Sequence, residues 1–583
     1  MQPSLGSGVE GVEAIRELSS VIQGALEREG RVYAEVKALQ KGFKADLNSI
    51  VFDNNSASVE DGRAKLMRSR ESLEELKIAC DLVVELKTYL EKQCVLAEKN
   101  VEDIALRVGF SSLPDDILAD ILVLATRPKH FRPPEYGDID VEAEMEALKE
   151  ACSFSHVCRR FRVLILHNPH LWNIISEHMV DISKLEARTE RSKETLVDVV
   201  LRSYGLRQVG NDAFSKFFEL SLLSSRRWRS FTLGKFSYHF QDHFRPTRDN
   251  WPKIRENMKT IGRLTGGLTF PCLERLLIWS DCVPSPGRWN TDFHPYWRWS
   301  MPQLVDLRIS GCIPPSAGVS FVGSLRSLMI RLDGKDLEDF EMIRLALFLS
   351  SCKVLERIEM FFLNWLRVPP CPDHAIPSVQ DVFLYLGCCK PAASTSICQS
   401  IHFPNATKAY LNLSSDKEFD GSDEEFELTE KREDLLQEFF LKHPLIKTFH
   451  LDYGSPDQGF IPITPPFYLL ISLENLILTF ASWLELKFWK DLPDSSKRLL
   501  PRLRTLELHA AHMHYVWDWF NPKVVEFFSQ LEEQGNLDAF ELFSIYTGAS
   551  FHASTVLEGP LSELLSEEKV FVDFGYPRRE RYY

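Results

Sequence analysis

Positive charge is scarce in this 583-residue sequence. Its 68 lysines and arginines are outnumbered by 83 aspartates and glutamates, which gives a formal net charge of −15. An acidic surface repels the phosphates of nucleic acids and of anionic lipids. We therefore expect neither nucleic acid nor a membrane among the partners of this chain.

Long uninterrupted apolar runs are also missing. Residues 1–20 contain Glu10, Glu13 and Glu17 and no apolar core, so we expect no secretory signal there. The most apolar later stretch, 467–484, is interrupted by Glu474 and Asn475, which hydrocarbon tolerates poorly. This stretch is typical of a buried strand and its neighbours.

The chain has twelve scattered cysteines but no CxxC pair, which excludes a zinc ribbon and a thioredoxin-like motif. Reduced thiols in a cytoplasmic or nuclear protein are the expectation. The sequence also lacks a phosphate-binding glycine loop with lysine, a GxSxG nucleophile elbow and an HExxH helix. We predict that the chain is not an enzyme and holds no cofactor and no metal.

Three further features could carry chemistry. His509, His512 and His514 could ligate a metal, although polar residues at the end of a strand are the favoured interpretation. The segment 226–229, Arg-Arg-Trp-Arg, mixes basic and aromatic residues as nucleic-acid platforms do. A loop rich in aromatic residues could form a binding surface or pack in the core; its members are Trp289, Phe293, Tyr296, Trp297 and Trp299.

Residues 1–109 form the first of three expected regions. Apolar residues recur at steps of three and four over two segments, which predicts two long helices separated by a turn at 53–56. In the second segment they follow heptad a and d positions: Leu66, Leu73, Leu76, Cys80, Val83, Leu90, Ala97, Val101 and Ile104. An antiparallel hairpin and a dimeric coiled coil both fit this pattern.

The second region, 110–177, begins with Leu113-Pro114 and two aspartates, which favour a helix start. A polar, proline-containing stretch follows at 127–137. A second helix is predicted over 154–164, and a short third helix starts at Asn168-Pro169 and bears Leu171, Trp172 and Ile175. The segments LPDDILADIL, SHVCRRFRVL and NPHLW occur in the order found in an F-box, and the region resembles that module. Phe161, where the family usually has tryptophan, and the long 127–150 connection depart from the pattern.

The resemblance implies that this region binds a Skp-type adaptor and, through it, a cullin–RING ligase. The implied adaptor-binding residues are Leu113, Pro114, Ile117, Leu118, Ile121, Val157, Cys158 and Trp172.

The third region, 178–583, repeats a phrase in which apolar residues stand at positions one, four and six. Clear copies begin at Leu273, Leu304, Leu325, Leu355, Val379, Ile446, Leu473 and Leu503. Their spacing resembles that of leucine-rich repeats, each with a short strand and a returning helix or loop. The predicted fold class is therefore α+β and multidomain: an N-terminal helical hairpin or coiled coil, a three-helix F-box and an irregular leucine-rich-repeat α/β solenoid. An ordinary α/β sheet is the alternative.

This combination predicts the substrate receptor of an SCF-type ubiquitin ligase, with an unknown protein substrate. A scaffold that binds the adaptor without directing ubiquitylation is the main alternative, and an enzyme with an undetected site is a more distant one. Residues between the apolar repeat positions alternate to the other side of each strand. The candidate substrate-binding residues are therefore Arg275, Leu277, Asp306, Arg308, Arg357 and Glu359.

Overall fold

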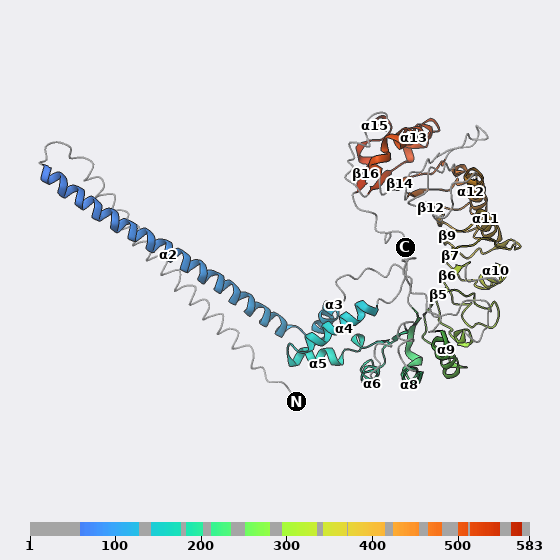
Figure 1. Cartoon of the computed structure of the whole chain (residues 1–583), viewed down its shortest axis with the longest axis horizontal. Coiled ribbons are helices and arrows are strands. Elements are labelled where there is room, and N and C mark those ends of the chain that lie inside the picture. The colour runs from blue at the N-terminus through green and yellow to red at the C-terminus, as the bar shows by residue number, and fades with distance from the viewer. Residues whose placement is uncertain are drawn as a thin grey trace. The chain divides into compact units, whose positions relative to one another are not determined.

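The computed structural model describes residues 59–126, 141–176, 182–201, 211–234, 251–279, 294–334, 342–369, 371–413, 424–453, 465–480, 500–510, 513–547 and 561–573. The chain divides into two compact units, Met1–Leu113 and Pro114–Tyr583 (Figure 1). The two predicted domain boundaries, after residues 109 and 177, stay predictions.

In the first unit the described element is α2 (Val59–Ser112), a single helix of 54 residues. It has no internal proline and ends just before Pro114, whose ring disfavours helical backbone in the residue that precedes it. Large apolar side chains are exposed along it, among them Leu66, Leu73, Leu90 and Ile104. The predicted earlier helix lies outside the described residues, so the choice between hairpin and coiled coil stays open.

The second unit begins with four short helical elements. They are α3 (Asp115–Thr126), α4 (Val141–Ser155), α5 (Arg159–His167) and the 3₁₀ helix η1 (Pro169–Leu171). Two helix starts are capped by side chains, because Cys158 Sγ accepts the Phe161 N–H at 3.4 Å and Asn168 Oδ1 accepts the His170 N–H at 3.1 Å.

Two sequence-based predictions for this segment need correction. The predicted connection 127–150 contains the start of α4, and the single helix predicted for 154–164 is interrupted between Ser155 and Arg159. The third predicted helix ends at Leu171, and Ile175 lies on a strand. Cys158 has extended backbone (φ −155°, ψ 168°), which ends the helical path and starts a new one.

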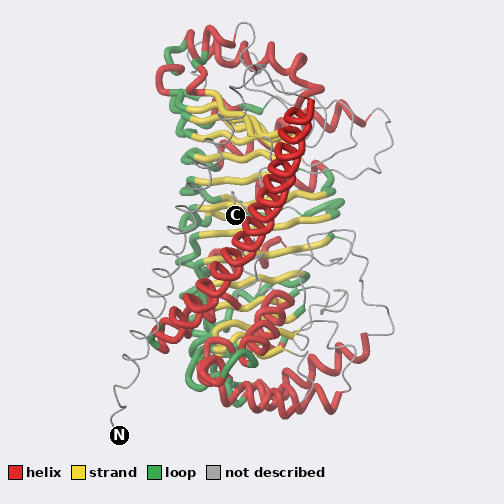
Figure 2. Tube along the Cα trace, turned by 90° about the vertical axis from the view of Figure 1, so that its left-hand side faces the viewer, coloured by secondary structure: helices red, strands yellow, loops and turns green. Residues whose placement is uncertain are grey.

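A 14-stranded parallel sheet forms the rest of the second unit, and its strands are hydrogen-bonded in chain order (Figure 2). The strands are β1 (Ile174–Ser176), β2 (Val197–Leu201), β3 (Trp228–Leu233), β4 (Arg275–Ile278), β5 (Asp306–Ser310), β6 (Ser327–Asp333), β7 (Arg357–Leu363), β9 (Asp381–Gly387), β11 (Lys408–Asn412), β12 (Thr448–Tyr453), β13 (Asn475–Phe480), β14 (Thr505–Ala510), β15 (Leu542–Thr547) and β16 (Val570–Asp573). Strands β8 (His374–Ala375) and β10 (Ile401–His402) form a separate parallel pair.

The predicted α+β class is wrong. The described residues form an α/β fold around one all-parallel sheet, in which helices and strands alternate along the chain. The prediction treated the helical regions and the repeat region as separate parts. Apolar spacing indicates whether a segment is a helix or a strand, but it does not indicate which strands pair. Parallel pairing joins residues far apart in sequence, as in Leu276 with Leu307 and Leu328 with Ile358.

Helices return the chain between many of the strands and lie along one side of the sheet (Figure 1). They include α6 (Ile182–Arg191), α8 (Asn211–Leu222), α9 (Trp251–Thr265), α10 (Met342–Ser351), α11 (Pro391–Ser400), α12 (Glu424–Lys442), α13 (Met513–Glu533) and α15 (Leu561–Leu564). The acidic segment 416–427, which the sequence suggests is a solvated loop, contains the first turn of α12; its residues 416–423 lie outside the described residues.

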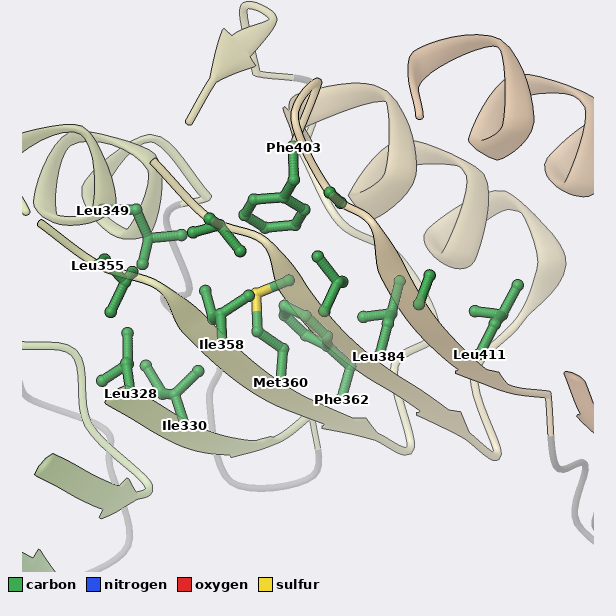
Figure 3. Close-up of a cluster of buried hydrophobic side chains, with 14 of the residues drawn as sticks. Leu328, Ile330, Leu349, Leu355, Ile358, Met360, Phe362, Leu384, Phe403 and Leu411 are labelled. Atoms are coloured by element: carbon green, nitrogen blue, oxygen red, sulfur yellow. The ribbon is translucent and has the colours of Figure 1, made fainter. Parts of the chain in front are cut away.

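The main hydrophobic core lies on this helix-covered side. Alternate strand residues point into it, as Ile358, Met360 and Phe362 of β7 do (Figure 3). Leu384 and Leu411 continue the same layer on β9 and β11. The remaining strand positions therefore belong to the opposite side of the sheet, which we call the second face.

Gly334, which follows β6, allows the loops after β6 and β7 to lie in contact. Its N–H donates to the Leu363 carbonyl at 2.7 Å. A Cβ atom there would lie 2.7 Å from the Asn364 carbonyl oxygen and 2.9 Å from the Trp365 Cα. Both are backbone atoms, which cannot rotate away as a side chain can.

Gly334→Ala is therefore expected to reduce the free energy of unfolding by about 1–3 kcal/mol, the range for an overpacked site. Urea denaturation of the full chain measures this. Gly323→Ala is the matched control, because nothing lies within 4 Å of its added Cβ. Equal midpoints for the two variants would contradict the proposed loop contact.

Candidate protein-interaction surfaces

The predicted adaptor-binding residues occupy three different environments. Pro114, Ile117, Val157 and Cys158 are exposed, with 45% of Ile117 and 66% of Val157 accessible. Ile121 is half-buried, and so is Leu113, which ends the first unit. Leu118 and Trp172 are in the interior.

An ion pair connects the starts of α3 and α5. Arg160 Nε donates to Asp115 Oδ1 at 2.8 Å, and Arg160 Nη2 lies 2.7 Å from the same oxygen. Asp115 follows Pro114, and Arg160 follows Cys158 by two residues. The pair therefore brings near one another two exposed segments, 114–117 and 157–158, that carry the apolar residues Pro114, Ile117 and Val157. We call these two segments the helix-start patch.

Leu118 and Trp172 have a packing role. Trp172 donates its indole N–H to the Ile165 carbonyl at 3.0 Å, and its own carbonyl accepts a bond from Arg188 Nε at 3.4 Å. The Arg191 guanidinium lies 4.7 Å from the centre of the Trp172 ring. Because both side chains are buried, a docking partner would contact their exposed neighbours and not Leu118 or Trp172.

The candidate substrate-binding residues lie on β4, β5 and β7 and share the second face. Cross-strand pairing places Arg275 beside Asp306, and Leu277 beside Arg308. Leu277 is 1% exposed because it packs in a small cluster with Trp279, Met329, Phe361 and Phe383. Because the Leu277 side chain is buried, the structure does not support its predicted direct contact with a substrate.

Ion pairs on the second face have a layered arrangement. Asp198 of β2 pairs with Arg229, whose Nε donates at 3.1 Å, and with Arg275 at 3.7 Å. Ser230 Oγ also donates to Asp198, at 2.6 Å. The Asp198 side chain is 4% exposed, whereas those of Arg229 and Arg275 are 35% and 29% exposed. The carboxylate thus lies beneath two guanidinium groups that reach the surface.

The same layering recurs on β7. Arg357 Nη2 lies 2.8 Å from Glu359 Oε1, and the arginine side chain is 39% exposed against 4% for the glutamate. On β5, Arg308 and Asp306 pair at 3.1 Å, and both are largely buried. We call Arg229, Arg275, Arg308 and Arg357 the arginine stripe.

Glu359 is as deeply buried beneath the stripe as Asp198, with 4% of each side chain exposed. Burial raises the pKa of its carboxyl group, and the positive charges of Arg357 and Arg308 partly oppose this rise. Among the described residues, Glu359 Oε2 and Arg308 Nη1 are buried without a hydrogen-bond partner. Unused donor and acceptor capacity is therefore present on this face.

An aromatic row adjoins the stripe from β7 onward. Ring centres are 5.1 Å apart for Phe361 and Phe383, and 4.1 Å for Phe383 and Tyr410, whose planes differ by 4°. Tyr410 also contacts the His450 ring at 4.6 Å and donates its hydroxyl to Asp452 Oδ2 at 2.5 Å. We call Phe361, Phe383 and Tyr410 the aromatic row.

Sequence reasoning missed the aromatic row, although a signal was present. Phe383 and Tyr410 stand at the same position of the repeated phrase as Arg308 and Glu359, between its second and third apolar residues. The alternation that selected the charged residues would also have selected these rings.

The other sequence candidates are not grouped into a site. His509 of β14 contacts Glu507 and Thr479, each at 3.4 Å; the position of His512 and the side chain of His514 lie outside the described residues. Within the described part of the chain, no three His, Cys, Asp or Glu side chains group as metal ligands would.

The aromatic candidates for binding are core residues where they are described. Trp228, in the basic segment 226–229, is 0% exposed and cannot offer its ring to a base. Tyr296, Trp297 and Trp299, in or beside the 3₁₀ helix η6 (Pro295–Arg298), are also buried. Trp289 and Phe293 lie outside the described residues.

Comparison with known proteins gave no match, either to a protein-family model or to a curated protein. Of the helices that the structure describes, none combines the length and apolar character needed to cross a membrane.

Proposed function

We propose that the chain is the substrate-receptor subunit of an SCF-type cullin–RING ubiquitin ligase. The F-box resemblance of 113–172 supports this proposal, and the observation that carries it is the exposure of the apolar side chains in the helix-start patch, with Ile117 45% and Val157 66% accessible. Exposed apolar side chains gathered at one place are typical of protein-interaction sites. Pro114, Ile117, Val157 and Cys158 would contact the Skp-type adaptor.

In this proposal the chain performs no covalent step and needs no cofactor. The helix-start patch would bind the adaptor, and the second face would bind a protein substrate. Holding both in one assembly raises the effective concentration of substrate near the ligase.

Adaptor capture tests the patch. Ile117→Asp combined with Val157→Asp is expected to weaken adaptor binding at least tenfold, about 1.4 kcal/mol, because each change places a charge in an apolar contact. A pull-down with purified adaptor and titration calorimetry measure the loss. Leu223→Asp is the matched control, since Leu223 is an exposed leucine outside the patch, and it should bind as the unmodified chain does.

Unchanged adaptor binding by a folded double variant would remove the patch from the proposal. A second measurement separates receptor from scaffold. Protein levels are compared in cells with and without the chain: accumulation of a bound partner supports the receptor, and unchanged partner levels support a scaffold without ubiquitylation.

A further inference from the structure

The second face from β3 to β11 combines two surfaces that a single extended ligand could contact. The arginine stripe spans β3 to β7, and the aromatic row continues from β7 to β11. Neighbouring strands lie about 4.8 Å apart, so the stripe extends over about 19 Å. An extended peptide advances about 3.3 Å per residue, so about six residues would cover it.

The layering of the stripe determines which charge it presents. Asp198 and Glu359 lie beneath the guanidinium groups of Arg229, Arg275 and Arg357. Buried carboxylates orient the guanidinium forks, and the three arginine side chains stay 35%, 29% and 39% exposed. The outer layer is therefore cationic, although the whole chain carries a formal charge of −15.

Arg308 adds a second observation within the stripe. Its Nε is used by Asp306, but its Nη1 is buried without an acceptor. A buried donor without a partner is unfavourable, so a carboxylate that enters the stripe would gain an additional hydrogen bond when the side chain turns toward it.

We propose that this face binds an extended acidic peptide, with carboxylate side chains over the arginine stripe and a large aromatic or aliphatic side chain against the aromatic row. The inference rests on the proposed function, since it gives the chemical class of the substrate segment. Arginine forks match carboxylates in geometry. In the aromatic row Phe361 and Phe383 are only 9% and 7% exposed, so a ligand would contact the half-buried ring of Tyr410, which stacks on Phe383. Alternate peptide residues would face the sheet, so acidic residues at every second position fit best.

Fluorescence anisotropy with labelled synthetic peptides and the full chain tests the proposal. The probe has three glutamates at alternate positions next to a Tyr-Phe pair, and it is made in both chain directions. Binding by one direction is expected, with an affinity that falls as salt rises. Replacing the glutamates by lysines should abolish binding, and replacing Tyr-Phe by Ser-Ser should weaken it about tenfold.

Protein variants locate the contact. Arg275→Gln with Arg357→Gln is expected to weaken peptide binding at least tenfold. Arg504→Gln is the matched control, because Arg504 is a similarly ion-paired but more exposed arginine next to β14, outside the stripe. The peptide substitutions use the unmodified chain, so they test the proposal even if the double variant fails to fold.

Several outcomes would overturn the inference: no binding of either glutamate peptide up to about 1 mM, equal binding of the lysine peptide, or binding only after phosphoserine replaces glutamate. Adaptor capture is measured on the same preparation. Adaptor binding without peptide binding overturns this inference alone, whereas peptide binding without adaptor binding leaves the acidic-peptide surface and removes the receptor role.

Discussion

Trp228→Ala is expected to lower the free energy of unfolding by about 3–5 kcal/mol, the range for removing a large aromatic side chain from a core. The ring is completely buried at the start of β3. It stacks on Phe231 with ring centres 5.4 Å apart and lies 5.1 Å from Phe270. These neighbours come from separate segments, so the cavity would weaken several contacts at once.

The indole N–H of Trp228 adds a polar component. It donates to the Ser221 carbonyl at 3.2 Å and to Ser224 Oγ at 3.1 Å, which connects β3 to the end of α8. Trp228→Phe keeps most of the ring volume but removes this donor, so an intermediate loss of about 1–2 kcal/mol is expected.

Chemical denaturation of the full chain measures both changes. Phe571→Ala serves as the control, because that ring is 45% exposed and its removal should cost less than about 1 kcal/mol. A loss of similar size for Trp228→Ala would show that the core around β3 contributes little to stability.

Mild acid is expected to destabilise the protein through two buried histidines. Burial lowers the pKa of His294 and of His443 to about 4, from an ordinary value of 6.5. In His443, Nδ1–H donates to the Phe439 carbonyl at 2.6 Å and Nε2 accepts the Phe403 N–H at 3.1 Å. This arrangement requires a neutral ring, since protonation would turn the acceptor Nε2 into a donor that faces another donor.

The sign of the pH dependence follows from proton binding. Between pH 6.5 and about 4 the unfolded chain binds more protons at these histidines than the folded chain does. The stabilisation is therefore complete above pH 6.5 and is lost as the pH falls through this window. For each histidine, the free energy of unfolding is expected to fall by about 3 kcal/mol as the pH decreases through the full window.

Urea denaturation at a series of pH values measures this effect. His443→Gln should reduce the dependence on pH within the window, whereas His170→Gln, at an exposed histidine, should leave it unchanged. An identical pH profile for the His443 variant and the unmodified chain would contradict the assigned role.

The individual strands were easier to predict than the sheet that they form. The apolar phrase beginning at Leu273 coincides with β4, and the phrase beginning at Leu304 coincides with β5. Alternation along a strand is a local property that sequence records. The pairing of β4 with β5 depends on the length and path of the intervening chain, which apolar spacing does not contain, so the predicted class was wrong.

The candidate surfaces show the same division. Charged residues such as Arg275 and Arg357 could be assigned to the second face from alternation alone. The sequence does not show that the carboxylates lie beneath the arginines, because the burial of Asp198 and Glu359 depends on neighbouring strands. Likewise, Leu118 and Ile117 are adjacent apolar residues in one motif, and only helix packing shows that the first is buried and the second exposed.

Strand β1 belongs to both parts of the second unit: it follows Trp172 by two residues and pairs with β2. The Asn173 carbonyl accepts the N–H of Asp198, the residue beneath the first two arginines of the stripe, at 2.8 Å. In the described stretch 168–176 no linker separates Trp172 from β1, and the hydrogen bond between Asn173 and Asp198 joins the two parts. The distance between an adaptor on the helix-start patch and a peptide on the arginine stripe would then be fixed by the fold. The reach of an attached ligase would then be set by the protein's architecture and not by random motion of a tether.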